Sequence, residues 1–181
     1  AIFGEPSGTK QITIGYKGRI AINMKINVGD SAHASAPWLA KNAIEESSLF
    51  VNEIKDKLEA GQENKTKGMM LTATITEIKG GLSHNVTPKE CDSTLDIRIP
   101  VDTDCKSVEE KISKAVKEIS EERQVEAYYS IIDETEPFEA EHNSPLVRAL
   151  TLGILDIEKN RPTLIRKTGT GDMNVIGNKL S

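Results

Sequence analysis

The chain has 181 residues, of which 28% are charged and 37% hydrophobic, and its formal net charge is -5. This is the composition of a globular protein, and a mildly acidic chain lacks the positive field that attracts nucleic acid or an anionic membrane. No apolar run reaches the roughly eighteen residues of a membrane span, so we predict neither nucleic acid nor a membrane as a partner. Cys91 and Cys105 form no C-x-x-C pair, which favours a reducing, cytoplasmic location.

The first strong pattern is the alternation of apolar and polar or small residues over 20–28, which predicts a half-buried strand. A loop through His33 and Pro37 follows. Apolar residues then recur at helical spacing up to Leu58, and we expect a helix with a Glu53–Lys57 pair at i, i+4 on its outer side. Gly61 suits the C-terminal cap of this helix.

Three further elements follow the same logic. Residues 69–78 and 93–99 are predicted strands, the second with Leu95, Ile97 and Ile99 on one face. Ser107 is the expected N-cap of a helix, with Glu110 completing a capping box. Alternation over 125–131 predicts a fourth strand.

The resulting order is β-α-β-β-α-β, so the predicted fold class is α+β, a ferredoxin-like two-layer sandwich with two helices on one face of a four-stranded sheet. The flanks do not belong to that pattern. Residues 1–13 contain a short strand and a Gly/Pro turn, 145–157 an amphipathic helix, 161–167 a strand, and a helix begins at Asp172. We predict a sandwich domain at 17–135, inserted into a host domain represented by 1–16 and 136–181, and an internal piece of a longer protein.

Several residues have side chains suited to a reactive site. Glu5 lies in a Gly/Pro turn after an apolar segment, His33 lies among small residues, and Asn85 follows paired glycines. Arg98 is on the polar face of its strand, where a guanidinium binds a carboxylate through two hydrogen bonds. Taken singly, each is more simply a turn acid, a loop histidine, a β-turn asparagine or a surface arginine.

Taken in order, the motifs resemble the zinc aminoacylase and carboxypeptidase family, which includes acetylornithine deacetylase, succinyl-diaminopimelate desuccinylase and glutamate carboxypeptidase. The motifs are GEPS at 4–7, YKGRI at 16–20, SAHASAP at 31–37, GGLSHNVTP at 80–88, DIR at 96–98 and GTGD at 169–172. The segment 166–174 is most similar to the branch that releases lysine or ornithine from an N-acyl or carrier-protein amide.

The resemblance implies a role for each motif. Glu5 would ligate one of two zinc ions, with cobalt as the alternative metal. His33 would reach from a lid into the partner subunit and stabilise the oxyanion, within a homodimer formed through the lid. Asn85 and Arg98 would hold the substrate carboxylate. The substrate pocket would be lined by Gly169, Thr170 and Gly171.

The resemblance implies a deacetylase-like or peptidase-like metallohydrolase of lysine or arginine biosynthesis, but most of the family's catalytic groups are missing. The other metal ligands and the general base of the family have no counterpart here. One carboxylate does not hold two zinc ions, so we expect the piece by itself to be inactive and unable to bind the pair. The alternative hypothesis is a stand-alone ferredoxin-like dimerisation or regulatory module without catalysis.

Overall fold

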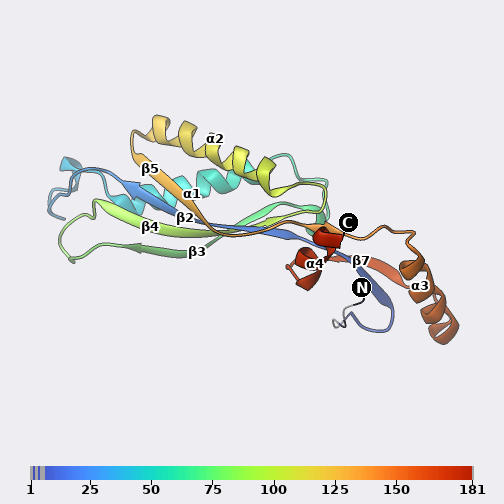
Figure 1. Cartoon of the computed structure of the whole chain (residues 1–181). Coiled ribbons are helices and arrows are strands. Elements are labelled where there is room, and N and C mark those ends of the chain that lie inside the picture. The colour runs from blue at the N-terminus through green and yellow to red at the C-terminus, as the bar shows by residue number, and fades with distance from the viewer. Residues whose placement is uncertain (1, 3, 5–6, 181) are drawn as a thin grey trace.

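The computed structural model of the chain describes residues 2, 4 and 7–180. Over these residues the chain forms a four-stranded and a three-stranded β-sheet, which lie end to end in an elongated molecule (Figure 1). The short strand expected near residues 1–3 and the predicted metal ligand Glu5 fall wholly or partly outside the described residues.

The larger sheet has the order β3-β4-β2-β5, and all its neighbours are antiparallel. Its elements are β2 (Gly18–Asn27), α1 (Ala43–Glu59), β3 (Thr72–Gly80), β4 (Glu90–Ile99), α2 (Cys105–Arg123) and β5 (Glu126–Thr135), with short 3-10 turns at Pro37–Leu39 and Lys67–Met69. Both α-helices cover one face of the sheet (Figure 1). This is the predicted ferredoxin-like sandwich.

The core of the sandwich lies between that face and the two helices. Leu95, Ile97 and Ile99 have no exposed surface, as the alternation in their strand predicted. The inward-facing residues of β2 are equally buried, and Phe50 and Ile54 meet them from α1. Each such aliphatic side chain contributes about 1.5–3 kcal/mol through burial.

The start of α2 differs from the prediction. Asp104 is the N-cap, and its carboxylate accepts hydrogen bonds from the backbone N–H (2.7 Å) and the hydroxyl (3.0 Å) of Ser107. Ser107 therefore lies inside the first turn, and the expected capping box with Glu110 is wrong. An aspartate satisfies the orphan N–H groups of the first turn as well as a serine does.

The expected Glu53–Lys57 pair on α1 is also replaced. Lys57 pairs with Glu118 of α2 (3.0 Å), and Glu53 pairs with Arg123 (2.7 Å). Arg123 also binds Glu46 at 2.9 Å. Both charged residues thus join the two helices instead of each other. Gly61, in contrast, has the positive φ of 76° that its predicted place at the helix end requires.

The smaller sheet has the order β6-β1-β7, with β1 parallel to β7. Its elements are β1 (Gln11–Tyr16), β6 (Phe138–Glu139), α3 (Pro145–Glu158), β7 (Thr163–Lys167) and α4 (Asp172–Leu180). Ile12, Ile14 and Val147 form a second cluster of buried side chains, separate from the core of the sandwich. Within the described residues, no helix is both long and apolar enough to cross a bilayer.

The N-cap of α2 generates a testable prediction. The hydrogen bonds from Ser107 lower the pKa of the Asp104 carboxyl. We expect Asp104→Ala to lower the urea midpoint at pH 7, and Glu110→Ala to leave it unchanged. Because the folded pKa is depressed, the contribution of Asp104 is present above the unfolded pKa of about 3.9 and is lost as the pH falls through the folded value. Urea titrations between pH 7 and about 3 measure this. A larger drop of the midpoint in Glu110→Ala than in Asp104→Ala would favour the capping box instead.

Candidate functional site

His33 lies at the end of the sandwich that is remote from the smaller sheet. It belongs to the loop between β2 and α1, and its side chain is exposed. The backbone N–H of Ser35 donates to Nδ1 (3.2 Å), and the Ser35 hydroxyl lies 2.8 Å from the same nitrogen. Because Nδ1 accepts from the backbone, the neutral ring carries its proton on Nε2. The ring therefore presents Nε2–H at the exposed tip, close to the Asn85 amide.

The hairpin loop between β3 and β4 brings Asn85 to the same place. The backbone N–H of Ala34 donates to the Asn85 carbonyl (2.8 Å), and His33 forms a β-bridge with Val86. The Asn85 amide nitrogen lies 3.5 Å from His33 Nε2, and its amide oxygen accepts from the Ser83 hydroxyl at 2.7 Å. The structure thus brings together two predicted site residues that are 52 positions apart.

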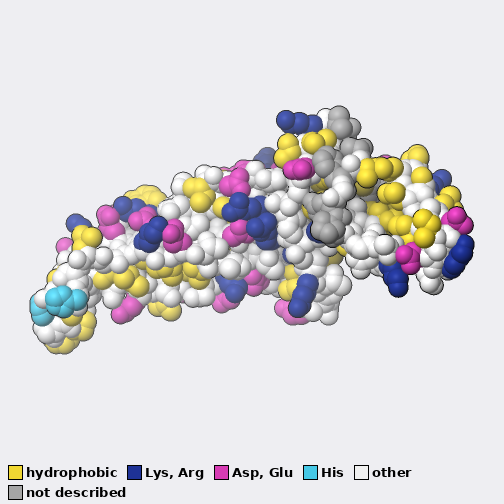
Figure 2. Space-filling model, turned by 90° about the horizontal axis from the view of Figure 1, so that it is seen from below, with side chains coloured by type: hydrophobic (Ala, Val, Ile, Leu, Met, Phe, Trp, Pro, Cys, Tyr) yellow, Lys and Arg dark blue, Asp and Glu magenta, His cyan; other side chains and the backbone are white. Residues whose placement is uncertain are grey.

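The two loops that carry this pair also carry exposed apolar side chains. Trp38, Leu39 and Leu82 are 79%, 72% and 107% exposed. A groove of about 510 Å³ runs beneath the hairpin loop, between Gly80–Ser83 and Val86–Glu90. Figure 2 shows histidine and hydrophobic side chains gathered at this end of the molecule. Sequence reasoning missed the apolar tip, although the single tryptophan of the chain directly follows Pro37 in the histidine loop.

Arg98 lies at the opposite end of β4. Its neighbours across the sheet are Arg19 in β2 and Thr72 in β3, whereas the hairpin loop leaves the sheet at Gly80 and Cys91. The seven-residue step from Cys91 to Arg98 corresponds to about 23 Å along a strand. The structure therefore does not bring Asn85 and Arg98 together within one chain.

The Arg98 guanidinium is bound by a carboxylate of its own chain. Its Nε and Nη2 donate to Asp96 at 2.6 and 3.2 Å, and Arg19 Nε donates to the same carboxylate at 2.7 Å. Lys17 lies close by with its side chain buried, and Nζ donates to the Met70 carbonyl at 2.5 Å. Burial, and secondarily the charge of Arg98, lower the pKa of Lys17. Arg19 also pairs with Asp133, so this end of the sheet combines three basic side chains with the two aspartates that bind the arginines.

The predicted pocket loop, Gly169 to Gly171, lies at the same end of the sheet as Arg98. It joins β7 to α4, and the backbone N–H of Lys17 donates to the carbonyl of Lys167, just before the loop, at 3.2 Å. Gly169 and Thr170 are exposed. Arg98 and the loop thus form one group at the junction of the two sheets, and His33 with Asn85 forms another at the tip.

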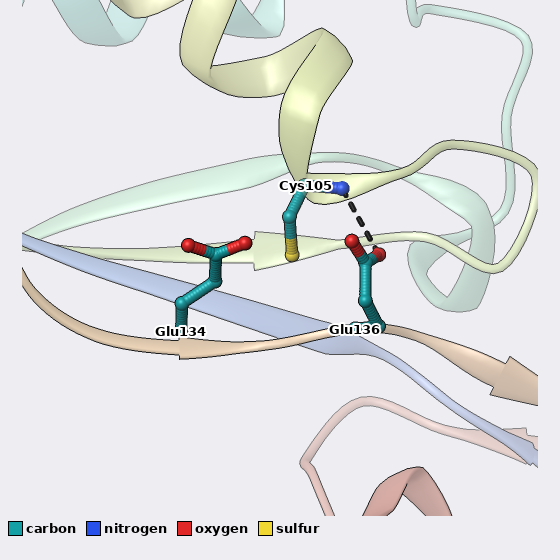
Figure 3. A group of neighbouring side chains, drawn as sticks. All are labelled: Cys105, Glu134 and Glu136. Carbon is teal, nitrogen blue, oxygen red and sulfur yellow. Dashed lines mark hydrogen bonds between the residues drawn. The ribbon is translucent and has the colours of Figure 1, made fainter. Parts of the chain in front are cut away.

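Among the residues that the structure describes, the single group with metal-ligand atoms close together is Cys105, Glu134 and Glu136 (Figure 3). Burial, followed by the charges of Glu136 and Glu134, raises the pKa of the Cys105 thiol to about 12. A thiol binds metal as the thiolate, so this thiol is a poor ligand at neutral pH. Glu136 accepts from the Cys105 backbone N–H at 3.1 Å and caps α2. The group does not fit a two-zinc centre.

Among curated proteins, the chain is similar in sequence to hydrolases. The chain is 32% identical, over 97% of its length, to a LysW-lysine/LysW-ornithine hydrolase of Saccharolobus solfataricus. It is 29% identical, over 98% of its length, to a protein of the same name from Sulfurisphaera tokodaii. It spans 45% and 46% of these two relatives, less than half of their length.

Solved structures agree on the fold. A tripeptidase from Staphylococcus aureus matches with a TM-score of 0.71 and 19% identity, over 92% of this chain and 42% of that chain. An M20 family metallo-carboxypeptidase from Sulfolobus solfataricus matches with a TM-score of 0.70 and 17% identity, over 97% and 51%. Residues 14–124 match the family model of the peptidase dimerisation domain, M20_dimer, which covers more than half of the chain. The resemblance read from the motifs is confirmed, and the chain belongs to the M20 peptidase dimerisation-domain family.

Proposed function

We propose that this chain is the lid, with parts of the catalytic domain, of a metal-dependent amidohydrolase that releases lysine or ornithine from a carrier-protein amide. A simple N-acyl amino acid is the alternative substrate, and lysine or arginine biosynthesis in the cytoplasm is the setting. The observation that carries the proposal is the similarity to LysW-lysine/LysW-ornithine hydrolases, which extends over 97% of the chain. A stand-alone dimerisation module does not account for similarity that continues through β7 and α4.

His33 suits the role of oxyanion donor in this reaction. Attack on an amide carbonyl develops negative charge on its oxygen, and a preorganised N–H donor stabilises that charge. Ser35 holds the His33 ring from the Nδ1 side, and Nε2 lies on the side of the Asn85 amide, 3.5 Å from its nitrogen. The position of this donor at an exposed tip favours a role outside its own subunit.

The two groups of predicted site residues can meet only in a dimer in which the tip of each chain reaches the junction of the other. Asn85 and Arg98 lie at opposite ends of β4, and a ten-residue strand does not fold back on itself. An antiparallel, two-fold contact between lids places the tip of one chain beside the junction of its partner. We therefore assign His33 and Asn85 of one subunit, with Arg98 and the 169–171 loop of the other, to one composite site.

Of the two edge strands of the larger sheet, β3 is the one that suits this contact. Its outer residues are exposed from Thr76 to Gly80, and Thr72, at its other end, is the cross-strand neighbour of Arg98. Antiparallel pairing of β3 with a second β3 would extend the sheet and bring each hairpin loop to the other chain's Arg98 end. Ile44 and Ile78, 36% and 40% exposed, add apolar surface along this edge.

The substrate side of the composite site would consist of the Arg98 guanidinium and the loop of small residues at 169–171. Asp96 occupies Nε and Nη2 of Arg98, so a substrate carboxylate would bind at the remaining Nη1 edge. The loop formed by Gly169, Thr170 and Gly171 presents backbone and one hydroxyl, and small residues let a substrate approach closely. Zinc, with cobalt as the alternative, would activate the water in such an enzyme. Glu5 would supply one ligand, and the other ligands of the family have no counterpart in this chain.

The role of His33 predicts a large kinetic effect. In the full-length protein, His33→Ala should lower kcat about 10²–10³-fold, the usual loss for one oxyanion donor. His84→Ala is the matched control, because His84 is an exposed histidine in the neighbouring loop, and kcat should not change. Steady-state assays of amide release measure both, and equal rates for the two variants would remove His33 from the mechanism.

The composite site predicts complementation between inactive variants. His33→Ala and Arg98→Ala each remove one half of every site in a homodimer. A mixed dimer keeps one intact site, so random mixing should restore about one quarter of the wild-type activity. The assay needs refolded or co-expressed mixtures, and mixtures that remain as inactive as the single variants would show that both residues act in the same subunit.

The choice of edge predicts which isoleucine matters for assembly. Ile78→Glu places a charge on the β3 edge and should weaken the dimer at least about tenfold, because a buried unpaired charge is costly. Ile132→Glu, on β5 at the opposite edge and 59% exposed, is the control. Sedimentation velocity distinguishes the two. Dissociation in Ile132→Glu alone would assign the interface to β5.

A further inference from the structure

The two sheets are joined at one place, where two segments of the chain cross side by side. Lys17 lies between β1 and β2, and Glu136 lies between β5 and β6. These two segments, called the crossings below, pack so closely that only glycine fits at position 18. A Cβ there would be 2.6 Å from the backbone nitrogen of Pro137 and 2.7 Å from the Thr135 carbonyl. Figure 1 shows α4 beside this junction.

The side chain of Asn174, in the first turn of α4, binds both crossings. Its amide nitrogen donates to the Lys17 carbonyl at 3.1 Å and to the Glu136 carbonyl at 2.7 Å. These two acceptors are the two segments that connect the sheets. Asn174 is only 2% exposed, so the bonds are made in a site from which water is largely excluded. Loss of either bond would leave a buried carbonyl without this donor.

The remaining polar atom of the same amide binds the pocket loop. Asn174 Oδ1 accepts from the backbone N–H of Gly171 at 2.8 Å, and the Asn174 N–H donates to the Gly171 carbonyl at 3.0 Å. The helix that carries Asn174 is held close to β6, since a Cβ on Gly177 would be 2.2 Å from the Phe138 ring. One amide group therefore connects three segments: the two crossings and the loop.

We infer that Asn174 is a positioning residue. It fixes the angle between the lid and the catalytic fragment, and it holds the pocket loop in a set position relative to both. The inference rests on the proposed function for its kinetic consequence. A rotation at the junction is amplified along the ten-residue strands β2 and β4, so a small change at Lys17 moves the tip by much more. The tip carries His33, and the loop faces the substrate, so both halves of the composite site depend on Asn174.

The orientation of the lid can be measured without any substrate. Spin labels would be placed at Lys114→Cys in α2 and Asp156→Cys in α3, whose native side chains are 77% and 87% exposed. The native thiols of Cys91 and Cys105 are buried and do not compete for the label. Pulsed electron–electron double resonance, with labelled chain diluted in unlabelled chain, gives the distribution of distances between the two spin labels, one in each part of the molecule.

Asn174→Ala should broaden that distribution about twofold or more, because the crossings lose their common donor. Asn174→Asp is the second variant: it keeps an acceptor for Gly171 but has no NH₂ group for the two carbonyls. It should broaden the distribution at pH 8 while the Gly171 amide stays protected from hydrogen exchange. In Asn174→Ala, that amide should exchange about tenfold faster or more.

Asn178→Ala is the matched control, since Asn178 is an exposed asparagine of α4 that donates one bond, to the Pro137 carbonyl at 3.1 Å. It should leave the distribution unchanged. A distribution that stays narrow in a folded Asn174 variant, with or without a lowered melting temperature, would overturn the inference, because a merely stabilising contact changes stability and not orientation. These readouts do not depend on catalysis, so a failed proposed function would leave them intact.

In the full-length protein, Asn174→Ala should lower kcat about tenfold or more, and the His33→Ala change should then cost less than it does in the wild type, since a mispositioned donor contributes little. Full additivity of the two changes would mean that Asn174 does not act through the lid.

Discussion

The length of β2 and β4 is the constraint on which the rest of the molecule depends. Ten residues of extended chain hold the tip of the sandwich about 30 Å from the junction with the smaller sheet. The antiparallel ladder and the helices packed on it make this distance rigid. His33 and Asn85 are therefore kept away from Arg98 and from the loop at 169–171, and a site that uses all of them needs two chains.

The charges are arranged to suit this separation. At the junction, Asp96 accepts from two arginines, while Nζ of the buried Lys17 donates to a backbone carbonyl. That end holds guanidinium groups, which can bind a carboxylate through paired hydrogen bonds. The tip, by contrast, offers exposed apolar side chains and the imidazole of His33. A donor of this kind is of use where negative charge develops on an amide oxygen, which is the chemistry expected of the family.

The junction is the weak point of such a design, because two single segments carry the entire connection between the sheets. At this junction, Gly18 lets the two segments pack closely, and the buried amide of Asn174 binds both of them. Cys105 and its two glutamates lie nearby, but the thiol pKa of about 12 makes Cys105 a poor metal ligand, and Glu136 accepts from its backbone N–H at the start of α2. Close packing at Gly18 and the bonds of Asn174 are therefore the contacts that would stiffen the junction.

The sequence by itself determined the elements whose signal is local. Alternation placed Leu95, Ile97 and Ile99 on one buried face, and the order of strands and helices implied the ferredoxin-like sandwich. Ordered motifs identified the family before any contact was known. Period and order are properties of neighbouring residues, so they can be read without the fold.

Tertiary structure decided which distant residues meet. It selected Asp104 over Ser107 as a cap, paired Glu53 and Lys57 with α2 instead of each other, and separated Asn85 from Arg98. It also brought Asn174 to Lys17, 157 positions away. Such contacts depend on sheet order, strand length and the geometry of the crossings, and no local pattern encodes the distance between two ends of a sheet.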